Sequence, residues 1–266
     1  QYIGAMALFG FASPAHWVTA QRGYSVCAVC HAWPAEPICS PCVERFAQPI
    51  ARCPRCTLPG DTTPCPVCTQ HPPPWDHGLC AVAYAYPWDS CLARLKFEGD
   101  SAMGRSLAHV MRHAPGIELA LEMAQWVVPM PLSIERLRER GFNQALVLAR
   151  HLSKRKALGQ ALLRIKDTAP QASLPKVQRL QNVVGTMVVN PLHAKALNQS
   201  SVVLLDDVMT TGSSLHAAAL ALRQVGVRHI TAMVFARTDA PRFNAPVAPS
   251  AMRENAGHVS HRLGSP

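Results

Sequence analysis

Apolar positions along the chain follow two spacings, one typical of buried strands and the other of amphipathic helices. The short apolar runs that predict strands are residues 80–86, 125–128, 201–205 and 230–236. The segments with helical spacing are a stretch that starts near Ser90, residues 142–152 and residues 213–225. Gly226 follows the last segment in the position where helices commonly end. Strands and helices alternate, which predicts an α/β fold with a parallel sheet and helices on its faces.

The first third of the chain has a different composition. Of ten cysteines, eight lie between Cys27 and Cys68, and prolines crowd the same region up to a run at residues 72–74. Such a run is stiff and extended, so we place a linker at residues 70–77. The predicted organisation is a cysteine-rich module at residues 20–70, a main domain at residues 78–240 and a disordered tail at residues 241–266. The tail is assigned no order because its prolines and polar residues show no periodicity.

The clustered cysteines form four C-x-x-C pairs, and eight residues separate the two pairs in each half of the module. A C-x-x-C turn places two thiolates on one side of a loop, so two turns supply the sulfurs of one tetrahedral zinc site. The predicted ligands of two structural zinc ions are Cys27, Cys30, Cys39, Cys42, Cys53, Cys56, Cys65 and Cys68. The ions are held either sequentially, by the first four and the last four cysteines, or in an interleaved arrangement.

A disulfide framework and a redox pair are the alternatives for these cysteines. Repeated C-x-x-C pairs fit metal better where no export signal precedes them, and a redox pair belongs beside a strand and a helix. Residues 1–18 lack the basic start, apolar centre and cleavage site of a signal peptide. We therefore expect a cytoplasmic protein. The two remaining cysteines, Cys80 and Cys91, are expected in the core of the main domain.

The composition predicts a soluble protein with anionic partners. The 266 residues are 48% hydrophobic, enough for one sizeable core and a small additional module. No membrane insertion is expected, because even the apolar residues 119–132 contain Glu122 and two prolines. The formal net charge of +10 favours polyanions, either nucleic acid or phosphorylated metabolites.

The segment with the most specific chemistry follows the predicted strand at residues 201–205. Its sequence is D-D-V-M-T-T-G-S-S, beginning with Asp206 and Asp207, and a helix comes after it. Backbone N–H groups, hydroxyls and a helix N-terminus at this place hold a phosphate well, and the two carboxylates can accept hydrogen bonds from a ribose. A helix capped by Ser213 or Ser214, without any ligand, is the alternative. That alternative gives no reason for adjacent aspartates at the end of an apolar strand.

This segment resembles the loop that binds 5-phosphoribosyl-1-diphosphate (PRPP) in the type I phosphoribosyltransferases. The resemblance rests on the apolar strand, the two acidic residues and the T-T-G-x-[ST] turn. It implies that Asp206 and Asp207 bind the ribose hydroxyls while the loop cradles the 5′-phosphate. The implied loop residues are Thr210, Thr211, Gly212, Ser213 and Ser214.

Basic residues are concentrated between the cysteine-rich module and the acidic segment. Residues 134–166 contain nine Lys and Arg against two Glu. The planar fork of arginine pairs with phosphate oxygens through two parallel hydrogen bonds, so Arg136, Arg138 and Arg140 are candidates for a diphosphate site. A solvated helix face and general contact with nucleic acid are the alternatives, and charge alone does not separate them.

Several further motifs resemble the ComF (GntX-related) family of competence proteins, over residues 27–238. They are V-P-M-P-L-S at residues 128–133, R-L-R-E-R-G-F-N-Q at residues 136–144, the pair Lys96-Phe97, and Gln171, Arg179 and Asn182. In the phosphoribosyltransferase fold, the turn after the strand predicted here at residues 125–128 binds diphosphate. The implied contacts are Met130, Pro131, Leu132, Ser133 and Arg136, and the implied catalytic residues are Asp206, Asp207 and Arg140. Arg179 is expected to close over the site from residues 166–182.

The resemblance implies a PRPP site that requires Mg²⁺, and a role in natural transformation, in which single-stranded DNA is taken into the cell. One interpretation is a phosphoribosyltransferase, whose acceptor no motif identifies. The other is a non-catalytic competence factor that binds nucleotides, single-stranded DNA or other competence proteins with the same fold. A zinc-ribbon protein whose second domain only dimerises is disfavoured by the intact loop. Aromatic residues for base stacking are few, and Trp75, Tyr84, Tyr86 and Trp88 are more typical of a core.

Overall fold

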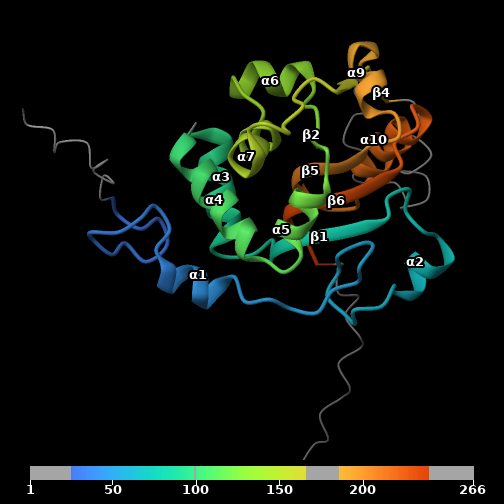
Figure 1. Cartoon of the computed structure of the whole chain (residues 1–266). Coiled ribbons are helices and arrows are strands. Elements are labelled where there is room, and N and C mark those ends of the chain that lie inside the picture. The colour runs from blue at the N-terminus through green and yellow to red at the C-terminus, as the bar shows by residue number, and fades with distance from the viewer. Residues whose placement is uncertain (1–24, 99, 166–185, 240–266) are drawn as a thin grey trace, which may run out of the picture.

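The computed structural model describes residues 25–98, 100–165 and 186–239. The elements in chain order are α1 (Ser40–Phe46), α2 (Pro66–Gln70), β1 (His77–Ala83), α3 (Trp88–Phe97), α4 (Ser101–His113), α5 (Ile117–Met123), β2 (Trp126–Pro129), α6 (Ile134–Arg140), α7 (Gln144–Ser153), β3 (Leu162–Arg164), β4 (Met187–Val189), α9 (Pro191–Leu197), β5 (Ser201–Met209), α10 (Ser213–Gln224) and β6 (His229–Arg237). Figure 1 shows helices on both faces of a central sheet, with the cysteine-rich segment along one side.

The main sheet has four parallel strands in the order β1-β6-β5-β2. β5 is central, and its residue Val203 lies opposite Thr231 of β6 on one side and Val127 of β2 on the other. β3 and β4 form a separate antiparallel pair. The prediction of an α/β fold with a parallel sheet is confirmed.

The boundaries of the predicted elements shift by a few residues. β1 lies three residues earlier than predicted. α7 begins at Gln144 instead of Phe142 because Asn143 caps it, with its Oδ1 accepting the N–H of Leu146 at 3.2 Å. Gly226 follows Val225, the C-cap residue of α10, and has a positive φ of 84°, as the stop position requires.

The largest difference concerns the acidic segment. The predicted strand ended at Leu205, but β5 continues to Met209. Asp206 pairs with Val234 of β6, so both aspartates lie within the strand and not in the loop after it. The pairing with β6 fixes the backbone of the aspartates more firmly than a loop would.

The two faces of the sheet support two separate hydrophobic cores. On one face Val203 and Phe235 pack with α3, α4, α5 and α7. On the other face Leu204 and Val234 pack with α10 and with the β3–β4 pair. Neighbouring strand residues point to opposite faces of the sheet, so each strand contributes side chains to both cores. Both faces are therefore buried, as is usual for a parallel sheet.

The cysteine-rich segment packs against this domain through apolar side chains. Val29 and Ile38 belong to the same core as α3 and α4, and the indole N–H of Trp88 donates to the Phe46 carbonyl at 2.9 Å. Trp75, from the predicted linker, is buried in the core on the α10 side. These contacts position both cysteine groups against the sheet and its helices.

Among the described helices, none combines the length and the apolar character needed to cross a lipid bilayer. The tail predicted to be disordered lies outside the described residues, as do Gln171, Arg179 and Asn182. The expectations for these segments therefore stay predictions.

Candidate functional site

The candidate site lies at the carboxyl edge of the sheet, where β5 and β2 end side by side. The N–H of Met130 donates to the Leu205 carbonyl at 2.8 Å, which fixes the turn after β2 beside the acidic end of β5. The side-chain amide of Asn143 donates to the Met130 carbonyl at 2.9 Å, so the start of α7 meets the same turn. A cavity of about 320 Å³ lies between these elements.

Most of the predicted ligand-binding residues meet in this cavity. Those that line it are Met130, Pro131, Leu132, Arg136, Arg140, Asp206, Asp207, Thr210 and Ser214. Polar residues that were not predicted as ligands also line it, namely Lys96, Asn143, Gln144 and Arg164. Ser133 is not among the lining residues. Its Oγ accepts the N–H of Arg136 at 3.3 Å and so caps α6.

The three candidate arginines of α6 differ in position. Arg136 and Arg140 are four residues apart, which places them on one face of the helix, and both line the cavity. Arg138 is about 200° around the helix from Arg136 and is exposed away from the cavity. Only two of the three arginines are therefore available to a ligand in the cavity.

Three residues that line the cavity each have a buried side-chain nitrogen without a hydrogen-bond acceptor among the described residues. These nitrogens are Arg140 Nε, Gln144 Nε2 and Arg164 Nε. A buried donor without an acceptor costs about 1–3 kcal/mol, so such groups normally meet water or a ligand. The Arg140 guanidinium also lies over the ring of Phe97, 5.3 Å from its centroid. These donors make the cavity suitable for a diphosphate, which accepts several charge-assisted hydrogen bonds.

The two aspartates form the acidic side of the cavity. Lys96 Nζ forms an ion pair with Asp207 Oδ2, and the N–H of Asp207 donates to Asp206 Oδ1 at 2.9 Å. The Asp206 carboxyl is enclosed by protein atoms although part of the residue reaches the cavity. Burial, and then the neighbouring Asp207 charge, raise the pKa of Asp206 well above its usual range, while Lys96 opposes the shift. A bound cation would favour the ionised form of Asp206.

The turn between β5 and α10 forms a second, smaller hollow of about 40 Å³. Gly212 has a φ of 78°, which a residue with a side chain rarely adopts. Thr211 Oγ1 lies 2.8 Å from Ser213 Oγ and accepts the Ser213 N–H at 3.3 Å. All five predicted loop residues line this hollow, namely Thr210, Thr211, Gly212, Ser213 and Ser214. Asp206 lines both the hollow and the larger cavity, so the two pockets adjoin.

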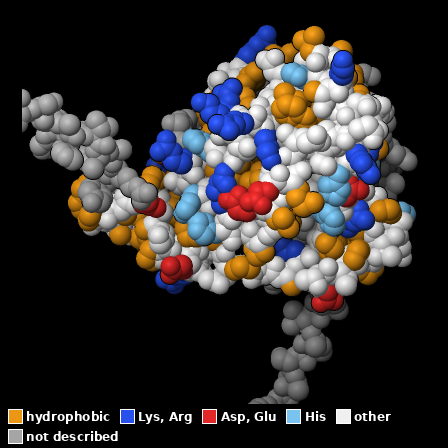
Figure 2. All heavy atoms as spheres, in the orientation of Figure 1, with side chains coloured by type: hydrophobic (Ala, Val, Ile, Leu, Met, Phe, Trp, Pro, Cys, Tyr) orange, Lys and Arg blue, Asp and Glu red, His pale blue; other side chains and the backbone are white. Residues whose placement is uncertain are grey.

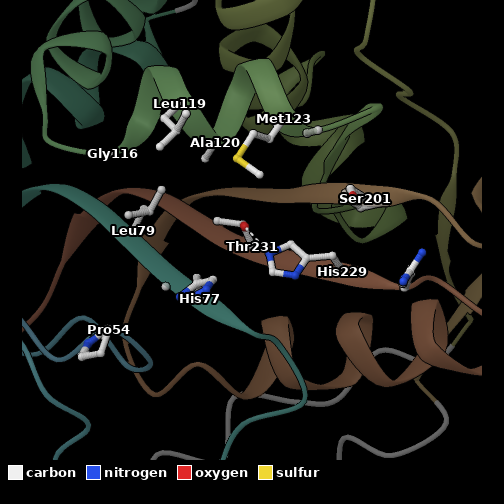
Figure 3. Close-up of a pocket in the computed structure, with 14 residues that line it drawn as sticks. Pro54, His77, Leu79, Gly116, Leu119, Ala120, Met123, Ser201, His229 and Thr231 are labelled. Carbon is white, nitrogen blue, oxygen red and sulfur yellow. Dashed lines mark hydrogen bonds between the residues drawn. The ribbon is translucent and has the colours of Figure 1, made fainter.

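A larger cavity, of about 670 Å³, lies at the opposite, amino edge of the sheet. Figure 3 shows Leu119 and Met123 of α5 above it and His77 and His229 on the strands below. His229 pairs with Asp76, with Nδ1 3.3 Å from Oδ2. None of the predicted PRPP residues lines this cavity.

Each half of the cysteine-rich segment forms a candidate zinc centre. The four Sγ atoms of each group lie within 4.8 Å of one another. The groups are Cys27, Cys30, Cys39, Cys42 and Cys53, Cys56, Cys65, Cys68, which is the sequential and not the interleaved arrangement. A tetrahedral zinc ion with 2.3 Å bonds requires sulfur–sulfur distances of about 3.8 Å. Distances of 3.9, 3.6 and 3.7 Å between sulfurs of these groups meet that requirement.

The electrostatics of the thiols also favour a cation. Burial raises the pKa of Cys27, but backbone N–H groups that donate to its sulfur outweigh burial and lower the pKa to about 6. The same balance lowers the pKa of Cys53 to about 6. In contrast, burial and the neighbouring thiols raise the pKa of Cys42 and Cys68. Four thiolates this close together are stable only around a positive charge, which zinc supplies.

Comparison with known proteins identifies the family. Residues 140–246 match the family described as the phosphoribosyl transferase domain. The DNA utilization protein YhgH of Escherichia coli is 31% identical over 211 residues, which cover 76% of this chain and 90% of that protein. Competence protein F of Haemophilus influenzae is 30% identical over 180 residues, covering 65% of this chain and 78% of that protein. The chain belongs to the ComF competence family.

A further ComF relative, the competence protein ComFC of Bacillus subtilis, is 38% identical over 100 residues, covering 38% of this chain and 39% of that protein. The parallel sheet and the two four-cysteine groups agree with the expected ComF architecture, a phosphoribosyltransferase-type domain with a cysteine-rich module in front of it.

Sequence reasoning did not assign a site role to Lys96 or Arg164. Lys96 stands in the last turn of α3 and pairs with Asp207, a residue far along the chain. Arg164 ends β3, where its apolar neighbours gave no sign of a polar site. The Lys96-Phe97 motif was the one available signal, because Phe97 lies under Arg140.

Of the other aromatic residues and cysteines expected in the core, some are buried and some are not. Trp75, Trp88 and Cys91 are buried, as expected of core residues, whereas Cys80 is half-buried and packs against the core on the α10 side. Tyr84 and Tyr86 are exposed, so the segment that follows β1 presents two aromatic rings to solvent.

Proposed function

We propose that this protein binds PRPP together with Mg²⁺ at the carboxyl edge of its sheet and acts in DNA uptake during natural transformation. The observation that carries the proposal is the pair of adjoining pockets, the hollow of the Thr-Gly-Ser turn and the donor-lined cavity, with Asp206 in the wall of both. PRPP has a phosphate at one end, a diphosphate at the other and a ribose between them. The layout of the pockets supports a ligand of that form.

Each part of the site has a role in this proposal. The turn at residues 210–214 holds the 5′-phosphate with its N–H groups and hydroxyls. Asp206 and Asp207 accept hydrogen bonds from the ribose hydroxyls. Arg136, Arg140 and the turn at residues 130–133 bind the diphosphate and stabilise its charge when it leaves. A bound Mg²⁺ would supply further positive charge to the leaving diphosphate. The acceptor would bond to C1 of the ribose as the C1–O bond to the diphosphate breaks, so no protein nucleophile is required.

The DNA-related part of the proposal is supported by the relatives, which are named for DNA utilization and for competence. The charge distribution agrees with an anionic partner, since residues 134–166 carry nine Lys and Arg against two Glu. On the face drawn in Figure 2, Lys and Arg side chains are spread over the region of α6 and α7. Such a surface attracts nucleic acid as well as phosphorylated metabolites.

Calorimetry with PRPP and Mg²⁺ tests the site. We expect the native protein to bind and the Asp206→Asn/Asp207→Asn double variant to lose measurable binding, because both hydroxyl acceptors are weakened and the charge for Mg²⁺ is removed. A matched control, Asp61→Asn/Asp89→Asn, removes the same net charge away from the cavity and should bind as the native protein does. Circular dichroism and zinc content establish that each variant is folded. Absence of binding by the native protein would refute the PRPP proposal.

A non-catalytic factor that binds nucleotides or single-stranded DNA is the second candidate. It is favoured by Phe97, which is 74% exposed and lies next to Arg140 at the cavity, because an exposed ring beside a cation is a stacking place for a base. Release of pyrophosphate that depends on Asp206 and Asp207 indicates the enzyme. Salt-dependent binding of oligo-dT without pyrophosphate release indicates the binding factor.

A further inference from the structure

The two cysteine groups have nearly the same local geometry. In the first group the N–H of Cys39 donates to Cys27 Sγ at 3.4 Å, and in the second the N–H of Cys65 donates to Cys53 Sγ at 3.3 Å. Cys39 and Cys65 are therefore equivalent positions, and both are half-buried. The groups differ in what surrounds them.

The first group lies against helices of the main domain. Val29 and Ile38, which lie between its cysteines in the sequence, pack in the core that contains α3 and α4, and Val43 and Val110 of α4 line the same surface cavity. These contacts lie on the helical side of the domain. Loss of the first zinc ion should therefore loosen the packing on α3 and α4.

The second group is connected to the phosphate-binding turn through Arg237. This side chain is 5% exposed. Its Nε donates to the carbonyl of Cys56 at 3.0 Å, and its Nη1 donates to the carbonyl of Met209 at 2.8 Å and to that of Thr210. One buried guanidinium thus joins the backbone of a candidate zinc ligand to the last residue of β5 and the first residue of the turn. The hydroxyl of Thr57 adds a weaker contact, 3.8 Å from Met209 Sδ.

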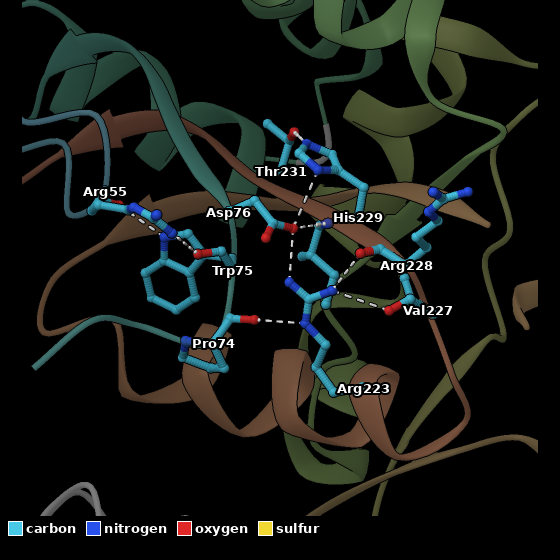
Figure 4. Close-up of polar contacts among 10 residues, drawn as sticks. Arg55, Pro74, Trp75, Asp76, Arg223, Val227, Arg228, His229 and Thr231 are labelled. Carbon is cyan, nitrogen blue, oxygen red and sulfur yellow. Dashed lines mark hydrogen bonds and ion pairs between the residues drawn. The ribbon is translucent and has the colours of Figure 1, made fainter. Parts of the chain in front are cut away.

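Trp75 makes a second connection between the same two places. Its indole N–H donates to the carbonyl of Arg55 at 2.8 Å, and Arg55 Nη1 returns a hydrogen bond to the Trp75 carbonyl at 2.8 Å (Figure 4). The far edge of the indole lies against Gly212, where its Cη2 would be 3.6 Å from a Cβ placed on that residue. Trp75 therefore packs directly against the turn in which Gly212 has a positive φ.

We infer that the second cysteine group supports the phosphate-binding turn and that Arg237 and Trp75 are the positioning residues that transmit this support. A loop whose N–H groups must converge on a phosphate gains affinity when it is already ordered. A zinc ion in the second group would then raise the affinity for PRPP, and PRPP would raise the affinity for zinc by the same factor, because such effects between two binding sites are reciprocal. The PRPP part of this inference rests on the proposed function, whereas the support of the turn does not.

The first experiment is amide hydrogen exchange on the full-length protein without PRPP. The test variants are Cys65→Ser and Arg237→Lys. Their matched controls are Cys39→Ser, at the equivalent position of the first group, and Arg112→Lys, which removes an arginine fork that bonds Glu118 and the Leu152 carbonyl away from the turn. We expect exchange at residues 209–214 to rise about tenfold in the test variants, as local opening becomes easier. The controls should leave exchange there unchanged.

The second experiment measures PRPP affinity of the same four proteins by calorimetry with Mg²⁺. The Kd should rise about tenfold for Cys65→Ser and Arg237→Lys, and the controls should stay within about twofold of native. If Arg237→Lys does not fold, Trp75→Phe replaces it, since phenylalanine loses the bond to the Arg55 carbonyl but keeps an aromatic ring near Gly212.

The outcomes separate the two proposals. Unchanged exchange of residues 209–214 in the test variants overturns the inference, and so does an equal effect of Cys39→Ser and Cys65→Ser. If the native protein does not bind PRPP but the exchange rises selectively, the proposed function fails and the support of the turn by the second group stands.

Discussion

Arg140 allows ligand binding to be separated from stability. Its Nε has no acceptor among the described residues, and its guanidinium lies 5.3 Å from the centroid of Phe97. Lysine at this position keeps the positive charge and can still lie over the ring, but it lacks the planar fork that forms two parallel bonds to phosphate. We predict that Arg140→Lys weakens PRPP binding and leaves the folding free energy nearly unchanged.

The magnitudes follow from these contacts. Loss of one hydrogen bond to a charged group costs about 1.5–3 kcal/mol, which corresponds to a Kd about 10 to 150 times higher. The substitution weakens the cation–π interaction with Phe97, which contributes about 0.5–1 kcal/mol to the free energy of unfolding. Lysine retains part of this interaction. Because the variant also removes a buried donor without an acceptor, the free energy of unfolding should change by less than about 1 kcal/mol.

Calorimetry with PRPP and Mg²⁺ gives the affinity, and urea unfolding gives the stability. Arg138→Lys is the control, because it makes the same change on the same helix but on the side away from the cavity. The reasoning is refuted if Arg140→Lys binds PRPP as tightly as Arg138→Lys does. It is also refuted if Arg140→Lys lowers stability by more than about 2 kcal/mol, which would indicate a structural role.

Three further predictions concern the aspartates and the cysteines. The pKa of Asp206 is raised in the folded protein, so its ionisation destabilises the native state as pH rises from the unfolded pKa near 4 toward the folded pKa. Asp206→Asn should therefore raise the melting temperature of the unliganded protein, and this gain should increase with pH over that range. A gain that shrinks with pH would contradict the prediction. Lys96→Met leaves Asp207 without its cation and should lower stability by about 1–3 kcal/mol in urea unfolding, with Asp207→Asn restoring most of the loss. Metal analysis should find two zinc ions in the native chain and one in either Cys39→Ser or Cys65→Ser; one ion in the native chain is the contrary result.

The sequence by itself determined the features that depend on neighbouring residues. Alternating strand and helix spacings predicted the parallel sheet, and the C-x-x-C pairs predicted two four-cysteine groups. The acidic segment and its Thr-Gly-Ser turn predicted where a phosphoribosyl ligand would bind. These signals are readable because turns, caps and chelating pairs are formed by residues within a few positions of one another.

The tertiary structure decided which distant residues meet. It selected the sequential cysteine groups over the interleaved arrangement, and it extended β5 through the aspartates because β6 pairs with them. It also brought Lys96 to Asp207 and placed Arg237 between Cys56 and the turn. An isolated lysine or arginine carries no sign of its distant partner in the sequence. The folded chain chooses that partner, because burying a charge is tolerated only where acceptors or an opposite charge surround it.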